Sequence, residues 1–421
     1  MNPDRQASLK ALNVWKNYSL LIITCLITLG CYVASYMRIP IVPIYAKSLG
    51  ASIKMVGTIN SAFFFTAGLL SFPMGFLSDK FGRKIIACGG LAILSLTCFA
   101  LYFTTSPLQI MIIYFLFGVG LSTYGPTMMS FVADITPVSH IGRAYGWYTT
   151  SLYLGMSIGP ALGSWIAERF SYGPVFLSSG VITLLLFAAM FLLLPSRKTA
   201  EVSAFSMSQS GSRSPKILQT LNSALVACWI VTFGGCFALG MFVTFIPLHA
   251  HDAGIALSRI GIIFFMQGLT NAISRAPFGW LSDRLSNRNK LVMAGMAMAI
   301  IALSGFALSK SLSHFIINAV LLGAGMAVAF PSIGAIITEV TSPDVRGIAM
   351  GGYNASIYFG IMSASLTMGP VIEKWGYRLA FQTAALLILL LALTFYIMIR
   401  HYYRRKKLQH GTPTSSRLNS P

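Results

Sequence analysis

Charged residues are scarce in this chain, and acidic residues are the scarcest of them. Only 10% of the 421 residues are charged, and Asp and Glu together number 10. A soluble domain carries about 25% charged residues, so the composition excludes water as the main solvent of this protein. The six cysteines show neither zinc-ligand spacing nor an extracellular disulfide framework. Phosphate-binding loop motifs are also missing, which argues against direct use of ATP.

Long apolar stretches are abundant instead. Hydrophobic residues make up 55% of the sequence, and the mean hydropathy is +0.73. About twelve stretches of roughly 20 residues recur, each long enough to cross about 30 Å of hydrocarbon. They lie near residues 18–38, 55–77, 85–104, 108–133, 142–165, 174–194, 222–246, 258–281, 291–309, 313–337, 347–370 and 378–400. The predicted fold class is therefore an all-α integral membrane protein with twelve transmembrane helices.

The net charge of +20 is unevenly placed along the chain. With twelve spans, most Lys and Arg residues fall in the two termini and in the loops on the same side of the membrane. This asymmetry predicts that both termini are cytoplasmic. We interpret the basic tail as a topology determinant, with binding to anionic lipid as the alternative, and we expect no nucleic-acid partner. The predicted location is the plasma membrane, as a multi-pass protein of the bacterial inner membrane.

One short phrase occurs twice, about half a chain apart. Residues 75–84 read GFLSDKFGRK, and residues 279–288 read GWLSDRLSNR. The matched positions before this loop differ by 204 and those after it by 205, and the register holds over about a hundred residues. Such a match indicates duplication of one membrane unit. We therefore expect two pseudo-symmetric six-helix bundles.

The domain boundaries follow from this repeat and from the polar segments. We divide the chain into a cytoplasmic N-terminal tail (1–17), a six-helix half (18–195), a cytoplasmic linker (196–220), a second six-helix half (221–402) and a basic, disordered cytoplasmic tail (403–421).

The repeated phrase resembles a loop of the major facilitator superfamily, which reads G-x-x-x-D-[RK]-x-G-[RK]-[RK] between the second and third helices. The first copy fits at every position, through Gly75, Asp79, Lys80, Gly82, Arg83 and Lys84. The second copy keeps Gly279, Asp283 and Arg284 but lacks the inner glycine. The resemblance implies that Asp79, Arg83 and its candidate partner Asp134 hold the two halves together when the outside is open. The alternative is a role in topology and folding alone.

A second resemblance concerns the fifth span, which is similar to the "antiporter" motif of twelve-helix drug and metabolite exporters. The matching residues are Gly146, Gly155, Gly159, Pro160 and Gly163. That motif ends in two glycines, whereas this chain has Ser164 at the last position. The alternative is a helix whose small residues serve packing only.

Two departures from the exporter pattern concern proton coupling. Tyr114 stands where such exporters often carry an arginine in the fourth helix. No carboxylate lies near the middle of a predicted span, although an intramembrane acid is the usual proton carrier. Protons as the coupling ion therefore follow from the resemblance alone.

Polar and aromatic residues at helical spacing are the candidates for a substrate cavity between the halves. They are Tyr32, Tyr36, Arg38, Asn60, Tyr124, Thr149, Tyr153, Gln267, Asn271, Arg275, Asn354 and Tyr358. Hydrogen bonding between helices is the alternative for each of them. Arg38 would attract an anionic group or face the outer headgroups, and Arg275 would line the cavity or reach the cytoplasmic face.

Taken together, these patterns predict a secondary active transporter and no enzyme. We expect it to move a small organic molecule across the lipid bilayer by alternating access, as an exporter of drug-like or metabolite substrates. An importer of a small metabolite or organic anion is the alternative, and a membrane enzyme or a receptor that does not transport is a further one. We expect no cofactor and a monomer.

Overall fold

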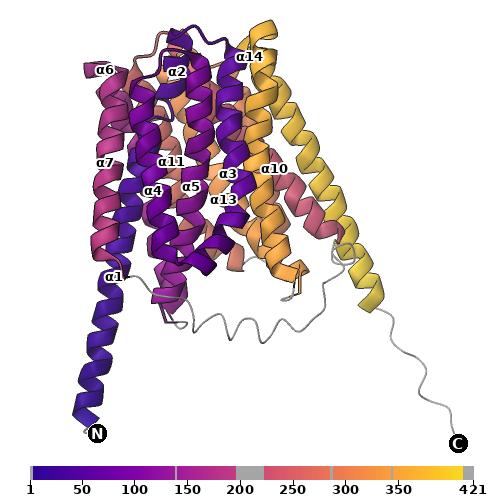
Figure 1. Cartoon of the computed structure of the whole chain (residues 1–421). Helices are drawn as coiled ribbons and strands as arrows, with labels where there is room; N and C mark the ends of the chain where they lie inside the picture. The colour runs from indigo at the N-terminus through magenta and orange to yellow at the C-terminus, as the bar shows by residue number, and fades with distance from the viewer. Residues whose placement is uncertain (1–2, 138–139, 196–221, 285–287, 343–344, 411–421) are drawn as a thin grey trace, which may run out of the picture.

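The computed structural model describes residues 3–137, 140–195, 222–284, 288–342 and 345–410. Within these ranges the chain is helical and contains no strand (Figure 1). The helices are α1 (Pro3–Met37), α2 (Ile41–Ser48), α3 (Ile53–Phe81), α4 (Arg83–Tyr102), α5 (Pro107–Ile135), α6 (Ile141–Phe170), α7 (Tyr172–Leu193), α10 (Ser223–Asp252), α11 (Leu257–Arg284), α12 (Arg288–Phe306), α13 (Leu312–Val340) and α14 (Arg346–His410).

The predicted fold class of twelve spans in two six-helix halves is confirmed. Nine of the described helices are long and apolar enough to cross a membrane. One of them, α14, comprises two helices that meet at a kink at Gly376. The helices α6 and α11 are long enough to cross as well, but they carry more polar residues. Counting α14 twice and including this polar pair gives the twelve expected passages.

Local chemistry explains where several helices begin. The Ser52 hydroxyl accepts a hydrogen bond from the backbone N–H of Met55 at 3.2 Å, at the start of α3. At the start of α10, Asn222 accepts one from the N–H of Leu225 at 2.8 Å. Each side chain satisfies a backbone donor that the first helical turn leaves without a partner. Gly82, between α3 and α4, has φ of 97°, a conformation that suits glycine.

The ends of the chain differ from what the sequence indicated. Helix α1 already begins at Pro3, within the expected N-terminal tail. Helix α14 continues to His410, although we expected disorder from residue 403 onward. Residues 403–410 contain no Gly or Pro and are rich in Lys and Arg, which are good helix formers. The linker 196–220 and residues 411–421 lie outside the described residues.

The two halves meet along two helix pairs. Helix α3 packs along α14, and α6 packs along α11. In the repeat register, α3 is equivalent to α11, and α6 is equivalent to the first part of α14. The two helix pairs are therefore related by pseudo-twofold symmetry. Gly57 faces the carbonyl oxygen of Ser365, and Gly261 faces that of Pro160. These contacts are equivalent by the repeat register, and a side chain at either glycine would push the helices apart.

The two ends of the bundle differ in the segments that they carry. Helix α1 begins and helix α14 ends at the same end, which we call the terminal end (Figure 1). The short helix α2 lies at the opposite end, which we call the far end (Figure 1). The core lies within each half and is mainly apolar, with Phe117, Phe242 and Phe395 among its fully buried side chains.

Candidate functional site

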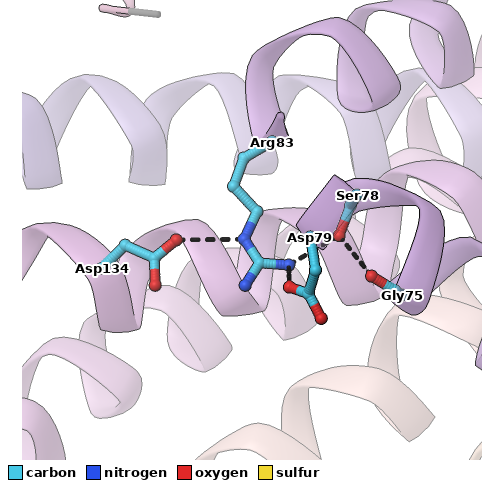
Figure 2. Close-up of polar contacts among 5 residues, drawn as sticks. All are labelled: Gly75, Ser78, Asp79, Arg83 and Asp134. Atoms are coloured by element: carbon cyan, nitrogen blue, oxygen red, sulfur yellow. Dashed lines mark hydrogen bonds and ion pairs between the residues drawn. The ribbon is translucent and has the colours of Figure 1, made fainter. Parts of the chain in front are cut away.

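A charged cluster ties three helices of the first half together near the terminal end (Figure 2). Arg83 Nε donates to Asp134 Oδ2 at 3.0 Å, and Arg83 Nη1 donates to the Ser78 hydroxyl at 2.6 Å. Arg83 also forms an ion pair with Asp79. The Ser78 hydroxyl in turn donates to the carbonyl of Gly75 at 2.7 Å. The sequence suggested Asp134 as the partner of Arg83, and the structure places the two side chains together.

Asp79 makes its ion pair within its own half, and 53% of its side chain is exposed. Among the described residues no ion pair or hydrogen bond joins it to the second half. Lys80 lies over the ring of Phe81 at 5.5 Å, and Lys84 lies over that of Phe191 at 5.2 Å. In this conformation the cluster therefore joins helices of the first half to one another. It does not link the first half to the second through these charged groups.

The second half carries the equivalent ion pair. Arg288 Nη1 lies 3.2 Å from Glu339 Oε2, and both residues follow Arg83 and Asp134 by 205 positions. The degenerate loop thus retains its arginine–acid pair, although the inner glycine is lost. The side chains of Gly279 and Asp283 lie outside the described part of the chain, and Arg284 is exposed at the end of α11.

An ion pair joins the two halves at the far end. Lys47 Nζ, at the end of α2, lies 2.7 Å from Asp252 Oδ1, at the end of α10. The hydroxyl of Tyr377 donates to Asp252 Oδ2 at 3.0 Å. The ring of Tyr377 stacks on that of His249, with centroids 4.5 Å apart. This stacking, with a further contact to the ring of Phe315, packs His249 between helices.

Two glutamates bind helix N-termini across the same end. Glu168 Oε2, near the end of α6, accepts a hydrogen bond from the backbone N–H of Ser258 in α11 at 2.6 Å. Glu373 Oε2 accepts one from the N–H of Lys54 in α3 at 3.1 Å. A carboxylate at a helix N-terminus meets the positive end of the helix dipole. Glu168 and Glu373 differ by 205 positions and their donors by 204, so the contacts are pseudo-symmetric. The repeat register relates Glu168 to Glu373, but it does not reveal their hydrogen-bond donors. Each donor lies in the other repeat.

Four glycines toward the terminal end make no such contact with the described residues. A Cβ atom placed on Gly142, Gly146, Gly347 or Gly351 would meet no atom of the described part of the chain within 4 Å. Gly57 and Gly261, by contrast, touch the backbone of the opposite half toward the far end. The halves are therefore joined by an ion pair and hydrogen bonds at the far end, and among the described residues these four glycines make no such contact.

The glycines of the fifth-helix motif mainly contact their own half. Gly155, Gly159 and Gly163 lie against the backbone of α1, at Leu29, Val33 and Met37. Contact with the other half comes from Pro160 and from Ser164 at the last motif position, which both lie against Gly261, while a Cβ atom on Gly146 would meet no atom of the described residues.

Tyrosines from both halves gather where α1, α6 and α14 approach one another. The centroids of the Tyr32 and Tyr36 rings are 6.0 Å apart. Tyr153 and Tyr358 lie close to Tyr36. Tyr353, which the sequence did not single out, neighbours Tyr153. Tyr153 and Tyr358, which occupy equivalent positions in the two repeats, thus both lie near Tyr36 of α1. Tyr353 lies five residues before Tyr358. This is not a spacing that places two residues on one helix face, so helical periodicity did not identify Tyr353.

Arg275 extends this group from α11. Its guanidinium carbon lies 4.0 Å from the centroid of the Tyr153 ring, and Nε donates to Asn271 Oδ1 at 2.8 Å. Gln267 lies two turns earlier on the same helix and is half-buried. The stripe predicted from helical spacing therefore brings Asn271 and Arg275 into direct contact.

Other candidates lie inside the first half. Tyr124 is fully buried, and its hydroxyl is 3.3 Å from that of Thr28. Arg38 is also fully buried, with its guanidinium carbon 3.4 Å from the Phe117 ring centroid. It therefore does not face outer headgroups. Asn60 is buried as well.

The polar pair predicted on the fifth and eleventh spans has less defined contacts. The Thr149 hydroxyl donates to the carbonyl of Tyr145 at 2.7 Å within α6, and Asn354 is exposed on α14. Among the described residues, no group of three His, Cys, Asp or Glu side chains could hold a metal ion.

Two halves of six helices that touch at one end and bear the same charged loop define a two-fold repeated membrane protein. The family model of the Major Facilitator Superfamily matches residues 24–256 and 228–419. The chain therefore belongs to the major facilitator superfamily, as the sequence motifs predicted.

Relatives and solved structures agree with this assignment. The chain is 21% identical over 374 residues to an uncharacterized transporter of this type from Methanocaldococcus jannaschii, covering 86% of this chain and 93% of the relative. It is 23% identical to the multidrug resistance protein MdtG of Proteus mirabilis, over 85% of this chain and 91% of that protein.

Among solved structures, a bacterial homolog of the human lysosomal transporter Spinster, in an inward-facing and unoccupied conformation, aligns with a TM-score of 0.74 and 13% identity. That alignment covers 92% of this chain and 98% of the other. A point mutant of the nucleoside transporter NupG aligns with a TM-score of 0.75 and 13% identity, over 90% and 99% of the two chains. These likenesses show the fold alone.

Proposed function

We propose that this protein is a secondary active transporter that exports small organic molecules, of drug-like or metabolite type, by alternating access. The observation that carries the proposal is the unequal contact between the halves. Hydrogen bonds and an ion pair join them at the far end, whereas a Cβ atom on any of four glycines toward the terminal end would meet no atom of the described residues. Such a bundle presents a site between its halves to one side of the membrane, and rocking of the halves presents it to the other.

The orientation in the membrane is part of this proposal. The excess of Lys and Arg in the termini and in the loops at the terminal end supports a cytoplasmic location for both termini. The far end is then the outer end, and this conformation is inward-facing. We place the protein in the inner membrane of a bacterium, as a monomer. Reporter fusions at Pro421 and within residues 196–220 should both indicate the cytoplasm.

The direction of transport rests on similarity. The fifth-helix motif resembles that of exporters, and MdtG is named as a multidrug resistance protein. Import of a small metabolite is the alternative, and the vesicle assay described below separates the two directions. With the far end held closed, loading would take place from the cytoplasmic side, as an exporter needs.

Protons are the coupling ion that the resemblance supports. The carboxylates whose side chains are described lie at helix ends and bind partners there, for example Asp134 with Arg83 and Asp252 with Lys47. A carboxylate that carries protons within the described part of the chain would therefore have to be released from an ion pair or from a helix N-terminus. Disruption of these contacts during rocking offers such a release.

Everted membrane vesicles provide the test. Vesicles that contain the protein should accumulate a substrate from a panel of metabolites and amphiphilic dyes, and collapse of the proton gradient should reduce this accumulation. Vesicles with the Asp79→Asn protein should retain the inserted protein but accumulate less, because the charged cluster is then impaired in the outward-open state. Uptake by right-side-out vesicles alone would contradict export, and transport unaffected by the gradient would contradict proton coupling.

A further inference from the structure

Arg275 holds a permanent positive charge between the two halves. Guanidinium groups stay protonated at all physiological pH values. The side chain is half-buried, and it is held on two sides, by the hydrogen bond from Nε to Asn271 and by the Tyr153 ring below its plane. These contacts fix the orientation of the guanidinium but use only one of its nitrogen atoms. Nη1 and Nη2 have no acceptor among the described residues.

The described carboxylates do not neutralise this charge. Asp79 and Asp134 bind Arg83, Asp252 binds Lys47, and Glu339 binds Arg288. The remaining two, Glu168 and Glu373, accept hydrogen bonds from helix N-termini at the far end. Arg275 is thus a fixed cation, in the part of the chain that the structure describes, that has an aromatic partner and an amide partner but no anionic one.

The other repeat shows that packing does not require the arginine. Subtraction of the repeat offset of 204 places Ser71 at the position equivalent to Arg275, and Ala67 at that of Asn271. Ser71 neighbours Tyr358 just as Arg275 neighbours Tyr153. The same helix pairing therefore forms around a small neutral side chain in one repeat. The charge and its supporting amide belong to one side of the pseudo-twofold axis only.

We infer that Arg275 binds the carboxylate of an organic anion, with Tyr153 and Tyr36 contacting the aromatic or apolar body of the same molecule. The two free amino groups of a guanidinium form a planar fork that matches both oxygens of a carboxylate. Aromatic faces next to the fork favour a ring attached close to that carboxylate. This inference rests on the proposed transport function and names the chemical class of substrate, an amphiphilic monocarboxylate.

Binding to the purified full-length protein in nanodiscs tests the inference without any transport step. The probes are 2-naphthoate and its neutral isostere 2-naphthamide, measured by equilibrium dialysis. We expect 2-naphthoate to bind about tenfold more tightly, which corresponds to about 1.4 kcal/mol. The Arg275→Ser protein, which copies the residue of the other repeat, should bind both probes with similar affinity. Arg275→Lys should keep part of the preference, because it retains the charge but loses the fork.

Arg378→Gln serves as the matched control, because this exposed arginine lies at the far end, beyond the site. It should retain the full preference for 2-naphthoate. Equal affinity of the unaltered protein for the two probes would overturn the inference, whether or not Arg275→Ser folds. A preference that persists in a folded Arg275→Ser protein would overturn it as well. If the preference holds but everted vesicles accumulate nothing, only the proposed export fails.

Discussion

Arg38 carries a positive charge inside the first half without an acid beside it. The side chain is fully buried, and among the described residues Nη1 and Nη2 have no hydrogen-bond partner. Burial of an unpaired ion costs several kcal/mol, whereas stacking on an aromatic ring such as Phe117 contributes about 2 kcal/mol when water is excluded. The balance predicts that the charge destabilises the fold, and that the apolar stem of the side chain is what packs.

We therefore expect Arg38→Met to leave the melting temperature of the purified protein unchanged or to raise it by about 2–4 °C per kcal/mol gained. Methionine keeps an unbranched apolar chain of similar length and removes the charge. Arg378→Met, at an exposed position, should have little effect and serves as the control. A fall of several degrees in the Arg38→Met protein would show that the guanidinium has a stabilising anionic partner.

Tyr153 and Tyr358 are equivalent residues with different neighbours. Tyr153 lies beneath Arg275, and Tyr358 packs on Gly68 and Ser71 of α3. We expect Tyr153→Ala to lower transport at subsaturating substrate about tenfold, because an aromatic face is worth up to about 1.5 kcal/mol beyond its buried area. Tyr153→Phe should do less harm and should alter substrate preference, since it removes only the hydroxyl.

For Tyr358 the packing against α3 predicts a different balance. Tyr358→Ala should lower protein yield as well as transport, because it leaves a cavity between the halves. Normal transport by a folded alanine variant at either position would end the hypothesis of a shared aromatic site. Uptake rates normalised to the amount of inserted protein separate the two effects.

At the scale of helices, two equivalent turns contain different residues. Ser171, between α6 and α7, has φ of 115° and ψ of −179°, and Gly376, at the kink within α14, has φ of 78° and ψ of 170°. The positions differ by 205, so one turn occurs in both repeats. Only glycine adopts this region without strain, and another residue costs about 1–3 kcal/mol there.

We predict that Ser171→Gly raises the melting temperature and that Gly376→Ser lowers it. The gain at Ser171 is reduced by the larger conformational entropy of an unfolded glycine, about 0.5–1 kcal/mol. Thermal unfolding of the purified protein, followed by size-exclusion chromatography, measures both changes. If the two substitutions shift the melting temperature in the same direction, the strain argument is wrong.

The repeat register explains how much the sequence predicted. Twelve spans, two halves and the proximity of Arg83 to Asp134 follow from apolar length and from the copied loop. The register also relates Arg288 and Glu339, which form the second ion pair. Contacts that cross from one repeat to the other were not predictable in this way. Neither the binding of Glu168 to the N-terminus of α11 nor the burial of Arg38 against Phe117 is specified by periodicity, because both depend on how helices pack in three dimensions.

At the scale of the whole molecule, the far end is held closed by three separate contacts. Lys47 and Asp252 form an ion pair, and two glutamates each bind a helix N-terminus of the opposite half. Transport requires this end to open, so the sum of these contacts has to remain small. Exposed carboxylates at helix N-termini contribute about 0.3–1 kcal/mol each, which suits a closure that must be reversible.

Glu168 and Glu373 act on closure as a pseudo-symmetric pair. Glu168→Gln and Glu373→Gln should each shift the equilibrium toward the open far end by about two- to fivefold, because each removes one charge from a helix N-terminus. Pseudo-symmetry makes the two shifts similar in size. In the double variant the shifts should multiply, since distant contacts without shared partners act independently.

The distance between spin labels at Ser48→Cys and Ala256→Cys, measured by pulsed electron resonance, reports this opening from both halves. The described cysteines are buried and do not compete for the label. Lys374→Gln is the matched control, because Lys374 neighbours Glu373 but stacks on Trp375 of its own half. High salt should reproduce part of the effect by screening the exposed carboxylates. An unchanged distance distribution in the double variant would show that the glutamates do not contribute to closure. A shift in only one of the two single variants would show that the equivalent contacts differ in the free energy they contribute to closure.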